Sequence, residues 1–166
     1  MQILSRAPLP GREEAARWHK AGSVKRLAVL LLALAVAGCR EVRVKTYAQG
    51  TTEAPGGNEI RIVQSSGELE RLGIHAPIRY KHEFGIVLLM GPHHDAGWHQ
   101  VIESIRANDY RVQVVAFDAG PPAGGDPTPE YRTYTLWIIP NSVYRRGSEI
   151  DVVTPSNTPV ASTVLR

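Results

Sequence analysis

Hydrophobic residues follow two patterns along this chain of 166 residues: one unbroken run near the N-terminus, and shorter runs with strand-like spacing after it. The unbroken run, Leu27–Gly38, follows the cations Lys25 and Arg26 and ends at Cys39. A bilayer takes about 20 apolar residues to cross, so the run is too short for a membrane anchor. It also lacks the polar face of a helix packed on a globular core. The pattern predicts an export signal.

The later runs predict β-strands. Ile60 and Ile62 alternate with polar residues, as in a strand with one buried face. Phe84–Met90 is continuously apolar, which is typical of a strand buried on both faces. Trp98–Ile105 and Tyr110–Phe117 flank a short polar turn, so we expect them to pair as a hairpin.

The remaining signals predict one short helix and one more strong strand. Ser65 and Glu68 have the spacing of a capping box, and Gly73 ends the helix that follows them. Tyr131–Ile139 is rich in β-branched and aromatic residues and ends at Pro140. The chain therefore predicts a β-rich (α+β) domain, a small antiparallel sheet or sandwich with one short helix.

Composition divides the chain into four expected parts. Gln49–Asn58 is polar, rich in glycine and without apolar periodicity, so we interpret it as part of a flexible linker. Pro155–Pro159 indicates a flexible tail, and Val24 is a candidate true start because signal peptides begin with short basic segments. We expect the lead with its cleaved signal peptide at residues 1–38 and the lipidated cysteine with its linker at residues 39–58. The β-rich domain is expected at residues 59–154 and the tail at residues 155–166.

The net charge belongs mostly to the segment that processing removes. Residues 1–38 contribute +4 to a total of +3, which leaves −1 for the rest of the chain. A nearly neutral domain has no basic patch for nucleic acid, so we expect no nucleic-acid partner. The chain has 1 cysteine, so the exported part has no disulfide if that cysteine carries a lipid.

The end of the export signal resembles the bacterial lipobox at Val36–Cys39. The resemblance implies that the Cys39 thiol takes a diacylglyceryl group, with palmitate chains, and becomes the N-terminus after cleavage. Arg40 stands where an Asp commonly retains Gram-negative lipoproteins in the inner membrane. By that rule we expect a lipid-anchored envelope protein, held on the periplasmic side of the outer membrane in a Gram-negative host.

Catalytic signatures are missing from the sequence. It contains no Gly-x-Ser-x-Gly elbow, no His-Glu-x-x-His pair, no phosphate-binding glycine loop and no dinucleotide fingerprint. We therefore expect a protein that is not an enzyme and has no cofactor. Aromatic residues offer a recognition surface instead, although core packing is expected for at least half of them: Trp98, Tyr131, Tyr134 and Trp137.

One histidine cluster has the chemistry of a metal site. His93, His94 and His99 stand beside Asp95, and imidazole with carboxylate binds zinc, copper or nickel. Neighbouring side chains in an extended segment point to opposite faces, which argues against His93 and His94 sharing one ion. We expect no metal site and keep a metal-binding lipoprotein as an alternative.

From Ile60 to Pro140 the order of elements resembles the C-terminal domain of PrcB-type proteins, lipoproteins that accompany and stabilise a surface protease complex. In that family a Ser-started helix follows a strand, as in Ile62–Leu69, and an apolar strand comes next, as in Phe84–Met90. Asp95–Trp98 stands in the place of a Thr-Gly-Gly-Tyr turn and keeps one glycine and the aromatic character. Arg132–Tyr134 stands in the place of a Thr-x-Pro-Tyr segment without the proline.

The resemblance implies a small β-rich fold and, through the family's name, a protease partner. It carries over no catalytic residue, and Gly97, Trp98 and Tyr134 transfer as turn-forming and packing positions. Our hypothesis is a non-catalytic protein that binds or stabilises another exported protein, with Asp95, Gly97 and Trp98 as tentative binding residues. The loop Gly120–Pro129, with 4 prolines and 3 glycines, is expected beside them. The alternative is a protease inhibitor, because the same turn is similar to a Gly-Tyr loop of chagasin-like inhibitors.

Overall fold

The computed structural model describes residues 40–41, 46–108, 110–122 and 124–166. The predicted export signal and Cys39 lie outside these residues. The helices of the described part are α2 at Ser66–Glu70 and the short 3-10 helix η1 at Asn141–Val143. Its strands are β1 at Arg40–Glu41, β2 at Thr46–Thr52, β3 at Glu59–Val63, β4 at Glu83–Asp95, β5 at His99–Ala107, β6 at Arg111–Ala119, β7 at Pro127–Pro140, β8 at Glu149–Val153 and β9 at Pro159–Val164.

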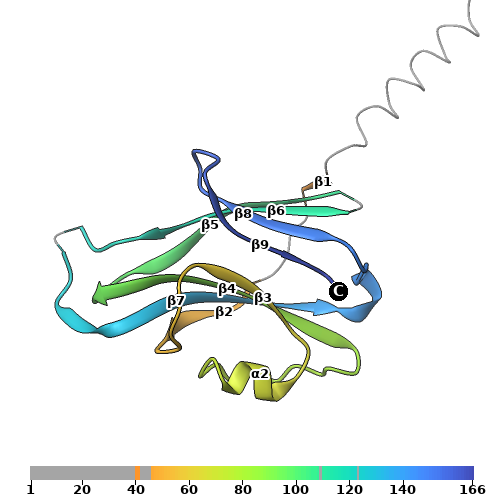
Figure 1. The fold of residues 1–166 in the computed structure, drawn as a ribbon, viewed down its shortest axis with the longest axis horizontal. Coiled ribbons are helices and arrows are strands. Elements are labelled where there is room, and N and C mark those ends of the chain that lie inside the picture. The colour runs from red at the N-terminus through yellow and green to blue at the C-terminus, as the bar shows by residue number, and fades with distance from the viewer. Residues whose placement is uncertain (1–39, 42–45, 109, 123) are drawn as a thin grey trace, which may run out of the picture. The chain divides into compact units, whose positions relative to one another are not determined.

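These strands form two sheets, which confirms the predicted β-rich fold. Sheet A has the order β1-β5-β6-β8-β9 and sheet B the order β2-β7-β4-β3 (Figure 1). β5 and β6 pair as the predicted hairpin. β6 and β8 run parallel, whereas the other pairs are antiparallel. The expectation of a purely antiparallel arrangement is therefore wrong for this one pair. A parallel pair needs a crossover, and here the chain passes through sheet B as β7 between β6 and β8.

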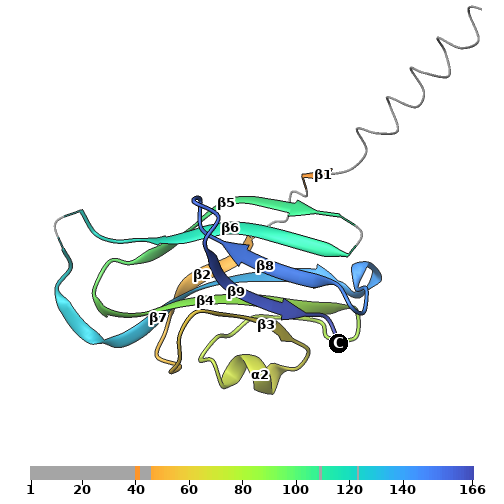
Figure 2. The same ribbon diagram turned by 45° about the horizontal axis from the view of Figure 1, so that its top comes forward.

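Two hydrophobic cores arrange the fold in three layers. The first core lies between the sheets and takes Leu88 and Trp137 from sheet B and Val114 and Ile150 from sheet A. Figure 2 shows β5, β6, β8 and β9 on one side of sheet B, and α2 on the other. The second core lies under α2 and includes Leu69, Leu72, Ile74, Ile78, Val87, Leu89 and Leu136.

Sheet B is therefore covered on both faces, as the unbroken apolar run Phe84–Met90 predicts. Leu88 and Leu89 are neighbours in β4, and their side chains lie in different cores with 0% of their surface exposed. The predicted helix is also present. The Glu68 carboxylate accepts the backbone N–H of Ser65 at 3.3 Å, and Gly73 ends the turn after the helix at φ +65°.

The linker prediction is wrong for residues 46–52, which form β2 at the edge of sheet B. The polar side chains of β2 find partners far away in the sequence. The Gln49 amide donates to the Thr135 hydroxyl at 3.0 Å. A side chain at Gly50 would lie 3.0 Å from the Tyr134 ring, so glycine lets that ring cover the strand. The folded domain therefore begins before Glu59.

The prediction of a flexible tail at residues 155–166 is also wrong. Residues 159–164 form β9, which pairs with β8, and Leu165 has 6% of its surface exposed and belongs to the first core. The segment after β8 is the turn of a hairpin. Thr154 and Thr158 close it through two hydrogen bonds, and Asn157 takes the left-handed conformation at φ +63°.

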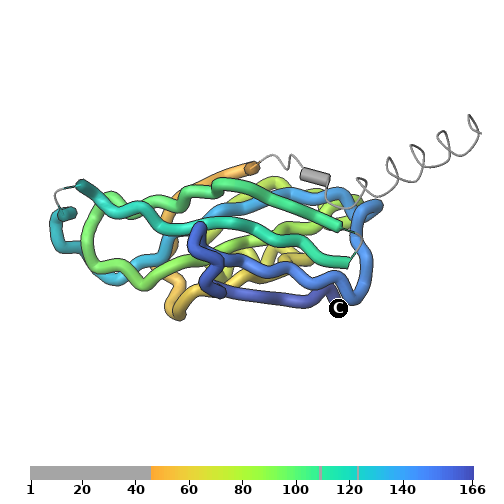
Figure 3. The backbone as a smooth tube through the Cα atoms, turned by 90° about the horizontal axis from the view of Figure 1, so that it is seen from above, coloured from red at the N-terminus to blue at the C-terminus, as the bar shows by residue number. Residues whose placement is uncertain are grey.

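The expected proline-rich loop is shorter than residues 120–129, because β7 begins at Pro127. The first residues of β7 pair with the end of β4, where His93 faces Tyr131 and Asp95 faces Pro127. β2 ends its pairing with β7 at Arg132, so this part of β7 has an open edge. An open edge tolerates proline, which lacks a backbone donor. Figure 3 shows this extension at the end of the domain opposite the C-terminus.

No helix among the described residues is long and apolar enough to cross a membrane.

Candidate functional site

The turn Asp95–Trp98 joins β4 to β5, and one hydroxyl closes it. Gly97 has φ +100°, a conformation that favours glycine. The Tyr131 hydroxyl donates to the Asp95 carbonyl at 2.6 Å and accepts the Trp98 backbone N–H at 3.3 Å. The phenol thus connects the two ends of the turn and holds its shape.

The Trp98 ring is packed on β4 and on the loop after β6. It stacks on the His93 ring with centroids 4.5 Å apart and planes 10° apart. A side chain at Gly120 would approach the Trp98 ring to 2.9 Å, so only glycine fits there. The loop after β6 also contacts the turn through Pro121, 3.2 Å from the Cβ position of Gly97. These contacts leave the Trp98 ring little freedom to change rotamer.

A polar network anchors His93 behind the Trp98 ring. The His93 Nε2 lies 2.5 Å from Asp118 Oδ2, and the two side chains are 11% and 9% exposed. A carboxylate has no hydrogen to donate, so the imidazole donates at Nε2. Thr133 donates its hydroxyl to the other Asp118 oxygen at 2.7 Å. The network joins β4 and β7 of sheet B to β6 of sheet A.

This His–Asp–Thr arrangement differs from the triad of a hydrolase. In a triad the imidazole contacts both the carboxylate and the attacking hydroxyl. Here the Thr133 hydroxyl contacts Asp118 and not the imidazole of His93. The geometry therefore suits bracing of the two sheets and of the Trp98 ring.

The histidines of the expected metal cluster do not converge. His93 points into the network with Asp118, whereas His94 and His99 are exposed. His99 Nδ1 lies 3.5 Å from the Gly97 carbonyl oxygen. No three His, Cys, Asp or Glu side chains of the described residues lie close enough together to hold a metal ion. The metal-binding alternative thus has no supporting geometry in that part of the chain.

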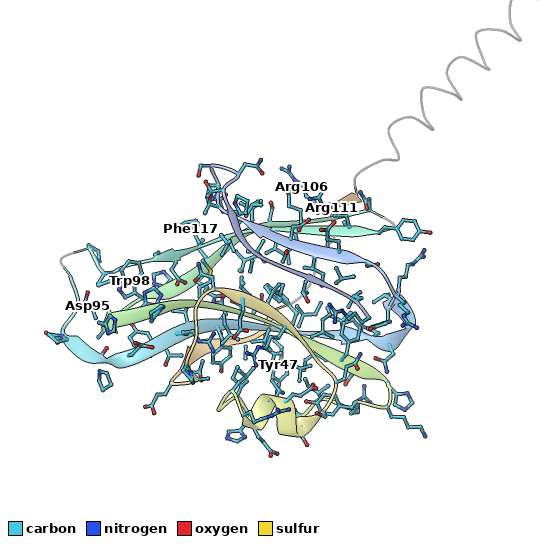
Figure 4. All side chains as sticks on the ribbon, in the orientation of Figure 1. Tyr47, Asp95, Trp98, Arg106, Arg111 and Phe117 are labelled. Atoms are coloured by element: carbon cyan, nitrogen blue, oxygen red, sulfur yellow. The ribbon has the colours of Figure 1, made fainter. Side chains whose placement is uncertain are left out.

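A groove of about 720 Å³ opens beside the turn; we name it the Trp98 groove. It brings together four segments that are far apart in the sequence. Figure 4 shows Trp98 and Asp95 at one end of the sandwich, away from Tyr47. The lining residues are Thr51, Thr52, Glu53, Gly73, Ala96, Gly97, Trp98, Thr128, Pro129, Glu130 and Tyr131.

Two of the three tentative binding residues, Gly97 and Trp98, line this groove. Asp95 is absent from its lining, and its carbonyl oxygen supports the turn through Tyr131. Glu53, expected in a linker, and Glu130 also line the groove, and neither is a site residue predicted from the sequence. No local signal marks these two residues, because they meet the turn only through the pairing of β2 and β4 with β7.

A buried arginine fixes the segment that leads from the Trp98 groove to β3. Arg132 is 1% exposed, and its guanidinium donates to the Ala54 carbonyl at 2.8 Å and to the Gly57 carbonyl at 2.9 Å. It also donates to the Glu59 carboxylate at 2.7 Å. Burial raises the pKa of Glu59, but the hydrogen bonds from Arg132 and Arg61 outweigh burial and hold this pKa below its usual value.

The described residues thus form a β-sandwich with a helical layer on sheet B and an aromatic groove at one end. Comparison of the chain with protein-family models, curated proteins and solved structures finds no match. The resemblance to PrcB-type proteins stays a hypothesis.

Proposed function

We propose that this chain is a non-catalytic, lipid-anchored envelope protein that binds another exported protein at the Trp98 groove. The lipobox-like segment supports the anchor, and the groove supports the binding role. Tryptophan and tyrosine are enriched where protein interfaces gain most of their affinity, because large rings contribute contact area and lose few rotamers.

The observation that carries the proposal is the rigid support of Trp98 and Tyr131 in the free protein. The Trp98 ring is stacked on His93, and the Tyr131 hydroxyl makes two hydrogen bonds to the turn. A surface that is ordered before binding loses less conformational entropy when a partner arrives. If Trp98 and Tyr131 served only to pack the core, they would not need to line a groove at the surface.

The class of partner follows from the family resemblance, which implies an exported protease that the lipoprotein accompanies and stabilises. A protease inhibitor is the second candidate. It is favoured by the turn and the loop after β6 lying side by side, since the Ala96 N–H donates to the Asp126 carbonyl at 2.8 Å. Two adjacent loops at one end of a sandwich can enter a cleft together. Inhibition assays on papain-type proteases separate the two candidates.

The test is capture of partners from crosslinked membranes with the full chain, the Trp98→Ala variant and the Tyr47→Ala control. Tyr47 is a matched control because it is an aromatic residue, 48% exposed, outside the groove. We expect wild type and Tyr47→Ala to retain one specific exported protein. Trp98→Ala should recover at least tenfold less of it, because truncation of an interface hot spot costs about 2 kcal/mol or more. Equal recovery by all three proteins, or no specific partner, contradicts the proposal.

A further inference from the structure

The Trp98 groove combines aromatic side chains with carboxylates from two segments of the chain. Trp98 and Tyr131 form the aromatic part, and Glu53 and Glu130 are exposed at its lining. Glu53 follows β2, whereas Glu130 belongs to β7. The groove therefore offers negative charge beside ring surfaces.

These two carboxylates are not neutralised within the described part of the chain. The ion pairs found there involve neither Glu53 nor Glu130. None of the residues that line the groove is Lys, Arg or His. A ligand with positive charge would therefore meet uncompensated attraction, while an acidic ligand would be repelled.

The aromatic walls select the same kind of ligand. The face of an indole or phenol ring carries negative potential and attracts ammonium and guanidinium groups within about 6 Å. The stem of a lysine or arginine is apolar and packs on such rings while its charged end stays near water. Rings and carboxylates thus both favour a long cationic side chain.

A second groove of similar size differs in the charge of its lining. It has a volume of about 700 Å³ and runs along β3 and β9. Its lining includes Arg61, Arg71 and Arg166, with Glu68 as its acidic residue. The two grooves therefore differ in charge.

We propose that the Trp98 groove receives a lysine or arginine side chain from an exposed basic segment of the protein partner. This inference rests on the proposed function, because it names the chemistry of the partner at the same site. The cation pairs with the carboxylates of Glu53 and Glu130, and its stem packs beside Trp98 and Tyr131.

The test measures binding of fluorescent peptides to the full chain in detergent micelles. One peptide carries lysines in a Gly/Tyr background, and its counterpart carries glutamates at the same positions. The variants are Glu53→Gln/Glu130→Gln and a control, Glu70→Gln/Glu103→Gln, which removes the same charge at two exposed residues outside the groove. Thermal unfolding checks that the variants fold.

We expect the lysine peptide to bind at least tenfold more tightly than the glutamate peptide and to weaken as salt rises. Glu53→Gln/Glu130→Gln should lose about fivefold or more of that affinity, since each exposed ion pair contributes up to about fivefold. The control should bind like wild type. Equal affinity for both peptides, or equal loss in both double variants, overturns the inference.

Membrane capture separates this inference from the proposed function. If the partner is lost with Trp98→Ala and kept with Glu53→Gln/Glu130→Gln, the protein interface stands and the cationic ligand is wrong. If the lysine peptide depends on the two carboxylates but no exported protein is captured, the charge preference stands and the proposed function fails.

Discussion

Arg132 shows how one residue can organise a segment that has no regular structure. Its guanidinium donates to two carbonyl oxygens between β2 and β3 and to the carboxylate of Glu59, the first residue of β3. Gly56 fits against it, because a side chain there would lie 3.0 Å from the guanidinium. Residues 53–58 are therefore ordered by a side chain more than 70 positions away.

We expect Arg132→Ala to lower the free energy of unfolding by about 3 kcal/mol or more, because it leaves a buried cavity and unpaired acceptors. Arg61→Ala serves as the control. Arg61 also pairs with Glu59, but its side chain is 50% exposed, so its loss should cost under about 1 kcal/mol. Urea unfolding of the two variants measures both values. Similar costs would mean that Arg132 does not anchor the segment.

The lowered pKa of Glu59 predicts a pH effect on stability. A carboxyl with a lower pKa in the folded state contributes stability above its unfolded pKa of about 4.5, and loses it as pH falls through the folded value. Wild type should therefore lose stability as the pH falls below about 5, and Glu59→Gln should lose less stability over the same range. Urea midpoints at several pH values measure this difference. Parallel pH profiles would contradict the prediction.

Individual strands differ in how clearly their sequence pattern predicts them. β4 was predicted from its unbroken apolar run because both of its faces are buried. α2 was predicted from its capping residues. β2 and β9 are edge strands with polar or small residues, so their periodicity resembles that of a linker or a tail.

The packing of β9 and the residue after it can be measured, and this packing distinguishes an ordered strand from a flexible tail. Leu165 is 6% exposed in the first core, whereas Val164 beside it is 45% exposed. We expect Leu165→Ala to cost about 2–4 kcal/mol and Val164→Ala under about 1 kcal/mol. Denaturant unfolding measures both. Equal, small effects would mean that the last residues do not pack as the structure shows.

For the molecule as a whole, the expected lipid anchor would hold the β-sandwich at a membrane surface. The prediction rests on Cys39 and the apolar run before it. Cells expressing the wild type should yield a membrane-bound form whose intact mass includes acyl chains and lacks residues 1–38. Cys39→Ser should appear in the soluble exported fraction, because no thiol is left to carry the lipid. An unmodified wild-type chain of full length would contradict this prediction.

The residues of the candidate site also fall into two groups, those that a local sequence pattern predicts and those that only tertiary contacts bring together. Gly97 and Trp98 were predicted because a glycine turn with an aromatic residue is visible in a few neighbouring positions. The support of Trp98 by His93 and Asp118, and the carboxylates of Glu53 and Glu130, were not predicted. Glu53 and Glu130 meet the turn only when β7 pairs with β2 and β4. Asp118 belongs to β6 and meets His93 only across the two sheets.

Local sequence patterns were enough to predict the β-rich class, the doubly buried strand β4, the capped helix α2 and the β5–β6 hairpin. Each of these depends on residues that are close together in the chain, so burial and turn chemistry leave a local pattern. The edge strands β2 and β9, the parallel pairing of β6 with β8 and the Trp98 groove became visible only in the folded structure. These depend on contacts such as Gln49 with Thr135, 86 residues apart, which no local pattern records.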